Sequence, residues 1–95
     1  MQATLMLKRR VAVDAESFAA FLVWRVPQAV PGSTHLYKYS AAYIARGVCV
    51  IRYDNERGKG DHKHIGDTEM PYVFTSPEQL LADFWSDVDQ WRATT

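Results

Sequence analysis

The chain has 95 residues, of which 47% are hydrophobic and 13% aromatic, and its formal net charge is zero. This length suits one small domain over residues 1–95, with enough apolar content to fold without disulfides or a structural metal. No apolar run approaches the ~18 residues of a membrane span, and the first ten residues lack the order of a signal peptide. We therefore expect a cytoplasmic protein that does not enter a membrane.

The zero net charge hides an asymmetry along the chain. Residues 1–65 hold ten Lys and Arg against five Asp and Glu, whereas residues 66–95 hold one against six. This separation favours a basic working surface with an acidic element elsewhere, although the two parts could also mix on the folded surface.

The first half of the chain predicts two strands. Residues 5–13 alternate apolar and polar side chains, and residues 14–17 (DAES) are typical of a turn. Residues 18–26 alternate again and are rich in aromatic and β-branched types, which favours a strand over a short helix across residues 15–21. The prolines and the glycine within residues 27–32 then predict a loop.

The middle of the chain predicts a β-hairpin. Residues 36–45 are rich in tyrosine and favour an extended strand, and residues 48–53 return as its partner. Gly47 lies between them and can take the positive φ that a tight turn requires. Cys49 is interpreted as a small buried hydrophobe, and residues 72–74 predict one further short strand.

Residues 76–91 carry the clear helix signal. Ser76 is a good N-cap, Pro77 suits the first helical position, and Gln79 stands where a capping box places Glu or Gln. One apolar stripe follows at helical spacing and comprises Leu80, Leu81, Phe84, Trp85, Val88 and Trp91. We predict that this stripe packs on the sheet, with Trp85 among its most buried residues. The predicted fold class is α+β, an antiparallel β-meander of four or five strands with a C-terminal α-helix packed on one face.

The least ordinary part of the sequence is the charged stretch of residues 53–66, YDNERGKGDHKHIG. Arg and Lys hold phosphate oxygens, and glycines such as Gly58 and Gly60 let a backbone approach a ligand closely. If residues 61–65 are extended, His62 and His64 point to one side, roughly 6–7 Å apart. One could then take the proton from a ribose 2′-hydroxyl while the other protonates the leaving oxygen.

For this chemistry the predicted catalytic residues are His62, His64, Arg57 and Lys59, the last two stabilising the charge that grows on phosphorus. The predicted substrate-binding residues are Tyr53, Asp54, Glu56, Asp61 and Lys63. We predict no metal and no cofactor. Tyr39, Tyr43 and Tyr53 could offer faces for base stacking, but packing in the core or between strands is the preferred interpretation.

Other interpretations of the charged stretch stay open. His62 and His64 could bind a metal, with Asp54 or Asp61 as third ligand, although the neighbouring cations disfavour one. The stretch could also be a solvated, salt-bridged hairpin loop with no chemistry. A further alternative is a non-catalytic binding module whose charged hairpin (53–64) docks a protein or nucleic-acid partner. His35 follows the Pro-Gly loop and is interpreted as a strand-edge residue, not as a third catalytic histidine.

Three blocks carry a resemblance that covers essentially the whole chain. WRVPQAVPGSTHLYKYSAAYI (24–44), YDNERGKGDHKH (53–64), and PYVF followed by EQLLADFW resemble the TumE family of toxin–antitoxin proteins. The second block is the most specific, because such an order of charged residues is improbable by chance. The site residues that the resemblance carries over are Asp54, Glu56, Arg57, Lys59, Asp61, His62 and His64, whereas their roles come from the chemistry above.

The resemblance implies a small bacterial or archaeal toxin encoded beside a helix-turn-helix antitoxin. By looser analogy with the compact RelE-like toxins, it implies an activity that cleaves RNA or blocks translation. The sequence therefore predicts a toxin that acts on RNA by metal-independent phosphodiester cleavage, an endoribonuclease if it is an enzyme at all. We expect either the antitoxin to cover the charged stretch or a homodimer to cover a sheet edge.

Overall fold

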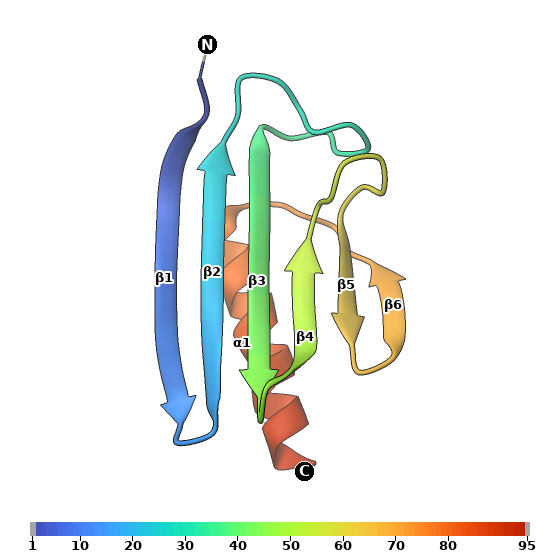
Figure 1. Cartoon of the computed structure of the whole chain (residues 1–95). Coiled ribbons are helices and arrows are strands. Elements are labelled where there is room, and N and C mark those ends of the chain that lie inside the picture. Colours follow the sequence, from blue (N-terminus) through green and yellow to red (C-terminus); the bar gives the residue numbers. More distant parts are fainter. Residues whose placement is uncertain (1, 95) are drawn as a thin grey trace.

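The computed structural model of the protein describes residues 2–94. Its elements are β1 (Thr4–Asp14), β2 (Ser17–Arg25), β3 (Tyr37–Ala45), β4 (Val48–Asp54), β5 (His62–Ile65), β6 (Thr68–Pro71) and α1 (Pro77–Ala93). Each strand pairs antiparallel with the next, so the six strands form one sheet in chain order (Figure 1). The helix crosses one face of this sheet, behind β2 to β4 in the view of Figure 1. We call the other side of the sheet the open face.

The predicted α+β meander with a C-terminal helix is confirmed, with six strands in place of four or five. The additional strands form the β5–β6 hairpin, and its first strand lies within the charged stretch of residues 53–66. The strand predicted at residues 72–74 is wrong, because β6 ends at Pro71 and an irregular segment leads to the helix. Proline lacks a donor for a sheet, and β6 tolerates Pro71 because this strand lies at the sheet edge.

The turns follow the sequence signals closely. The β3–β4 turn has positive φ at both Arg46 (52°) and Gly47 (78°), the pattern of a two-residue hairpin turn that continues the twist of its strands. The alternative helix across residues 15–21 does not form, since β2 begins at Ser17. The prediction that Cys49 is buried is wrong: it is exposed, beside the β3–β4 turn and opposite a register shift after Tyr43.

The core lies between the sheet and α1. The sheet contributes alternate residues of β2, β3 and β4, and the helix contributes Leu80, Phe84 and Val88, which are at most 1% exposed. The ring of Phe84 makes edge contacts with Phe21 at 5.1 Å and with Tyr53 at 5.9 Å between centroids. These contacts fix the helix across the centre of the sheet.

Trp85 is not among the most buried residues of the stripe, so that prediction is wrong. Residues 80, 84 and 88 follow one i, i+4 line that faces the sheet directly, whereas Leu81, Trp85 and Trp91 flank it and are only partly buried. The preferred interpretation of the tyrosines is confirmed, since Tyr39, Tyr43 and Tyr53 are at most 3% exposed and belong to the core. None of the helices among residues 2–94 is long and apolar enough to cross a membrane.

Candidate functional site on the open face

The strand register sets two rows of side chains across the open face. The first row comprises Lys8, Leu22, Ser40, Asp54 and His62, and the second comprises Arg10, Ala20, Ala42, Arg52, His64 and Glu69. In a sheet, residues that are directly opposite each other on neighbouring strands point to the same face. Each row therefore runs from a cation on β1 to a histidine on β5.

His62 and His64 lie on this face as their spacing in a strand requires, with ring centroids 5.1 Å apart. They differ in exposure: the side chain of His62 is 7% exposed and that of His64 is 37% exposed. His64 is thus open to a ligand from solvent, whereas His62 lies beneath the surface of the same site.

Two acceptors hold the buried ring of His62. Its Nδ1 lies 2.9 Å from the backbone oxygen of Gly60, and its Nε2 lies 2.8 Å from Oδ1 of Asp54. This second contact is close but not aligned as a hydrogen bond, and Oδ1 is buried without another donor. The other carboxylate oxygen of Asp54 lies 2.9 Å from Nε of Arg52. Asp54 therefore joins His62 to the cation that neighbours His64.

One set of residues here could hold a metal ion. The ligand atoms of His62, His64 and Glu69 lie within 4.8 Å of one another. A hydrogen bond from Nδ1 of His62 to a carbonyl would leave Nε2 facing this set, as metal-binding histidines commonly do. The third ligand differs from those that the sequence suggested, because Asp61 has other partners. The guanidinium of Arg52 beside Asp54 opposes a cation at this place.

Asp61 belongs to a separate network that ties three segments together. Its carboxylate accepts hydrogen bonds from Ser33 at 2.5 Å and Tyr39 at 2.7 Å, and lies 2.7 Å from Nε2 of His35. Burial raises the pKa of the Asp61 carboxyl, but the contacts with these three partners together lower it by more. The pKa therefore lies below its usual value of 3.8. The ring of His35 also stacks on Phe74 at 4.1 Å. No pattern in the sequence predicts this role for His35.

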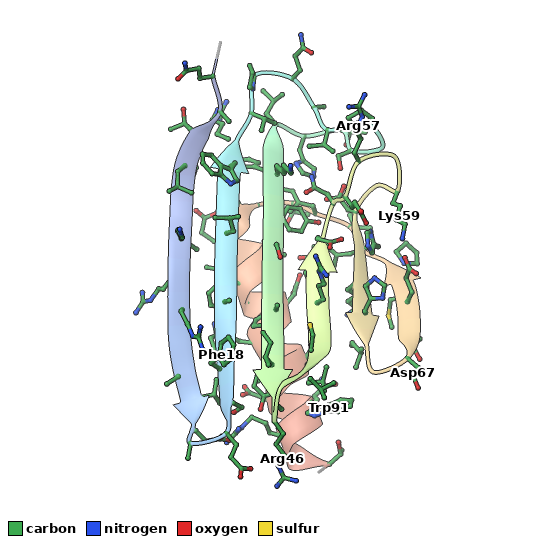
Figure 2. The ribbon with its side chains drawn as sticks, viewed as in Figure 1. Phe18, Arg46, Arg57, Lys59, Asp67 and Trp91 are labelled. Carbon is green, nitrogen blue, oxygen red and sulfur yellow. The ribbon has the colours of Figure 1, made fainter. Side chains whose placement is uncertain are left out.

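The loop between β4 and β5 carries the remaining charged candidates. Glu56, Arg57 and Lys59 are exposed there, and Figure 2 shows Arg57 and Lys59 at the upper end of the sheet. Lys59 lines a hollow of about 390 Å³ together with His35 and Asp61. The loop adds positive charge at this end of the sheet, and neither Arg57 nor Lys59 has an ion pair among the described residues.

The glycines of this loop meet another loop. A Cβ at Gly32 would lie 2.6 Å from the backbone nitrogen of Gly60, and both residues have positive φ. The amide of Gly58 also donates to the carbonyl of Pro31 at 2.8 Å. The close backbone approach therefore joins the two loops, and it fixes the segment from which His62 begins.

Tyr53 and Lys63 lie on the helix side of the sheet. The hydroxyl of Tyr53 donates to the Asp87 carboxylate of α1, and Nζ of Lys63 lies 3.0 Å from the same carboxylate. Burial, followed by the hydrogen bond to Asp87, raises the pKa of Tyr53. The thickness of the sheet thus separates these two predicted substrate-binding residues from the histidines.

Sequence reasoning missed Arg52 and Glu69 at the site. Arg52 pairs directly with His64, and Glu69 pairs with His64 from the other side. Arg52 and Asp54 share one face of β4 by simple alternation, which was available from the sequence. Their place beside His64 depends on the register of β5, which local patterns do not determine.

The fold and the site define a small α+β protein with a histidine pair on a sheet face that carries several cations. Over residues 3–92 the chain matches the model of the family described as Toxin TumE. The chain therefore belongs to the TumE toxin family, which confirms the resemblance and gives it a toxin role with an antitoxin as partner. Searches among curated proteins and among solved structures returned no match.

Proposed function

We propose that this toxin cleaves RNA without a metal ion at the histidine pair of the open face. The observation that carries the proposal is the placement of His62 and His64, whose ring centroids are 5.1 Å apart. Two imidazoles that reach one phosphodiester can serve as base and acid in a single displacement. The cation Arg52 stands beside His64 in the register, where charge would develop on the phosphate.

The different surroundings of the histidines suggest their roles. His64 is the more exposed ring and takes the proton from the ribose 2′-hydroxyl. His62, whose Nε2 stands 2.8 Å from the Asp54 carboxylate, protonates the leaving 5′-oxygen. The 2′-oxygen bonds to phosphorus as the bond to the 5′-oxygen breaks. The products are a 2′,3′-cyclic phosphate and a 5′-hydroxyl.

One acid and three cations support this chemistry in the proposal. Asp54 is a positioning residue, because it contacts His62 and the two imidazole rings, not Asp54, contact the phosphate. Arg52 stabilises the charge on phosphorus from the sheet, and Arg57 and Lys59 do so from the exposed loop. Tyr53 and Lys63 could contribute only through the helix side, by holding β4 and β5 against α1.

The first prediction concerns the two histidines. His62→Ala or His64→Ala should each lower kcat/KM for RNA by at least about a hundredfold, since a general acid or base typically contributes ~10²–10⁴-fold. The double variant should lose less than the product of the single losses, because the pair acts as a unit. Asp67→Asn is the matched control, since Asp67 is exposed in the turn of the same hairpin (Figure 2).

The same assay separates the proposal from its rivals. If EDTA abolishes cleavage and Zn²⁺ or Mn²⁺ restores it, His62, His64 and Glu69 bind a metal. The proposed acid and base roles of the two histidines would then be wrong. If the protein shows no turnover while changes at Arg57 and Lys59 weaken its association with a partner, the charged hairpin is a docking surface. The protein would then be a non-catalytic binding module.

For the partner, we propose a helix-turn-helix antitoxin that covers the open face. The resemblance to TumE proteins supports the type of partner, and the exposed cations and His64 on this face support the location. A homodimer that covers β1 or β6, the two edges of the sheet, is the alternative.

A further inference from the structure

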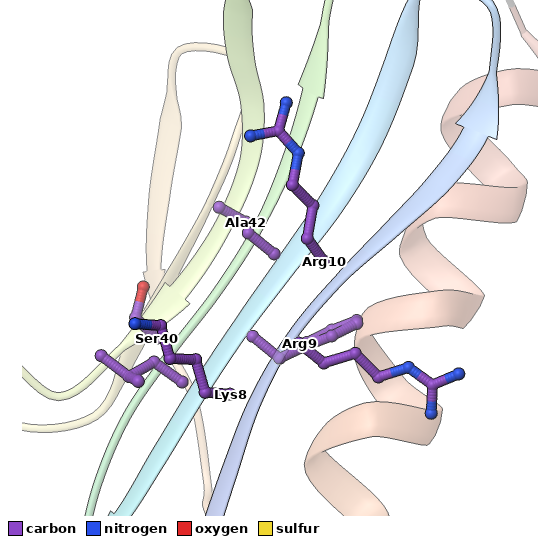
Figure 3. Close-up of a pocket in the computed structure, with 8 residues that line it drawn as sticks. Lys8, Arg9, Arg10, Ser40 and Ala42 are labelled. Atoms are coloured by element: carbon purple, nitrogen blue, oxygen red, sulfur yellow. The ribbon is translucent and has the colours of Figure 1, made fainter.

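The open face extends well beyond the histidines to a basic groove on the first three strands. The groove has a volume of about 540 Å³ and is bordered by Lys8 and Arg10 of β1. Its floor holds the small or apolar side chains of Ala20, Leu22, Ser40 and Ala42. Arg9 and Phe21 also border the groove, but they pair with each other in the row that faces the helix. Figure 3 shows Lys8 and Arg10 on the groove side, whereas Arg9 extends toward the helix.

The two groove cations are available to an external anion. Within residues 2–94, no ion pair engages Lys8 or Arg10. The guanidinium carbon of Arg10 lies 3.7 Å from the centre of the Phe18 ring, which orients the side chain without neutralising it. Arginine held on an aromatic ring keeps its donors for phosphate oxygens.

The register links this groove to the histidines. Arg10 stands opposite Ala20, Ala20 opposite Ala42, and the same row continues through Arg52 to His64. Four strand spacings separate Arg10 from His64, which is about 19 Å at ~4.8 Å per strand. The alanines between them leave room for a ligand to lie close to the backbone of the sheet.

We infer that the groove is a subsite for single-stranded RNA, whose backbone crosses the strands from Arg10 to His64. Lys8 and Arg10 bind phosphates several nucleotides away from the phosphodiester at the histidines. A partly buried apolar floor flanked by cations suits a strand with unpaired bases, and the row leads directly to the proposed cleavage site. This inference rests on the proposed function, and it adds a length requirement to the substrate.

The test compares two substrates and two neighbouring arginines. A dinucleotide reaches the histidines but not β1, whereas a longer single-stranded RNA reaches both. Arg10→Ala should reduce the preference in kcat/KM for the longer RNA over the dinucleotide by at least roughly tenfold, the effect of one hydrogen bond to a charged group. Lys8→Ala should act in the same direction. Arg9→Ala removes the same charge from the helix side and should leave the preference unchanged.

A binding measurement gives a readout that does not depend on cleavage. A 2′-O-methyl oligonucleotide lacks the nucleophile, so its dissociation constant can be followed at graded salt. Arg10→Ala should reduce the slope of log affinity against log salt by about 0.7, the value for one phosphate contact on a single strand. Circular dichroism and thermal melting of each variant establish that the fold is intact.

Two results would overturn the subsite. One is an equal effect of Arg9→Ala and Arg10→Ala on the preference for longer RNA, which would mean that only the overall charge matters and not the groove. The other is an unchanged salt slope in Arg10→Ala with weaker antitoxin binding, which would assign the groove to the protein partner. If wild type cleaves no RNA but shows the predicted slope change, the proposed cleavage fails and the RNA-binding surface stands.

Discussion

Asp61 contacts two side chains of the loop before β3 and one side chain of β3 itself. It lies one position before His62, yet its carboxylate points to Ser33, His35 and Tyr39 and not to the histidine pair. It thereby ties the loop before β3 to the loop before β5. The position of His62 depends on this tie, because the Gly60 carbonyl that accepts from its ring belongs to the same loop.

Asp61→Asn should lower the free energy of unfolding at pH 7 by about 2 kcal/mol, the scale of hydrogen bonds to a charged group. The folded pKa of Asp61 lies below 3.8, so its stabilisation is present above that pH. As pH falls through the lowered pKa, the difference between wild type and variant should disappear. Urea unfolding of both proteins at pH 7 and at several pH values below 4 measures it. A difference that stays constant with pH would contradict the role of the charge.

At this scale the sequence predicts only what alternation controls. The common face of His62 and His64 follows from their spacing in one strand, and it needs no knowledge of the other strands. The neighbours of His64 could not be predicted in the same way. Arg52 and Glu69 reach it from β4 and β6, and the register of these pairings is not determined by the local pattern of β5.

At the scale of elements, the local sequence predicts α1 well and the β5–β6 hairpin poorly. The helix starts as predicted: Ser76 accepts from the amide of Gln79 at 3.1 Å, and Pro77 is the first helical residue. The side chain of Gln79, however, donates to Asp83 at 2.8 Å, one turn further along the helix. The strand β6 was not predictable, because Glu69 and Pro71 are poor strand formers and only the pairing with β5 makes them one.

Phe84→Ala should lower the free energy of unfolding by about 3–5 kcal/mol, since it removes a fully buried ring from between the sheet and α1. Trp85→Ala is the matched variant on the next helical position. It should cost less, because Trp85 is only partly buried and touches the core at its border through Phe21. Unfolding of both variants in guanidinium or urea measures which substitution causes the larger loss of unfolding free energy. A larger loss for Trp85→Ala would contradict the observed helix orientation.

For the whole molecule, the asymmetry of charge along the sequence becomes a separation in space. Asp83 and Asp87 of α1 accept hydrogen bonds from Tyr72 and Tyr53 on the helix side of the sheet. Cations dominate the open face on the opposite side, with Lys8, Lys38 and Arg10 among those without an ion pair in residues 2–94. The basic surface and the acidic element that composition suggested thus have defined places. Charge alone does not predict which anion such a surface would bind.

The antitoxin should slow hydrogen exchange of the amides in residues 55–61, the loop beside the histidine pair, if it inhibits by covering the open face. The amides of α1 lie on the other side of the sheet and serve as the internal reference. Mass spectrometry of the toxin alone and in complex measures both. Tight binding that protects the helix and leaves the loop unchanged would place inhibition away from the proposed site.

The most direct test of RNA cleavage at the histidine pair is the chemistry of the product ends. Purified toxin, freed of antitoxin, is incubated with single-stranded RNA in EDTA, beside the His64→Ala variant, and the fragments are analysed by mass spectrometry. The proposed mechanism predicts fragments that end in a 2′,3′-cyclic phosphate and begin with a 5′-hydroxyl, in wild type and not in the variant. Intact RNA with wild type, or equal cleavage by His64→Ala, would contradict it.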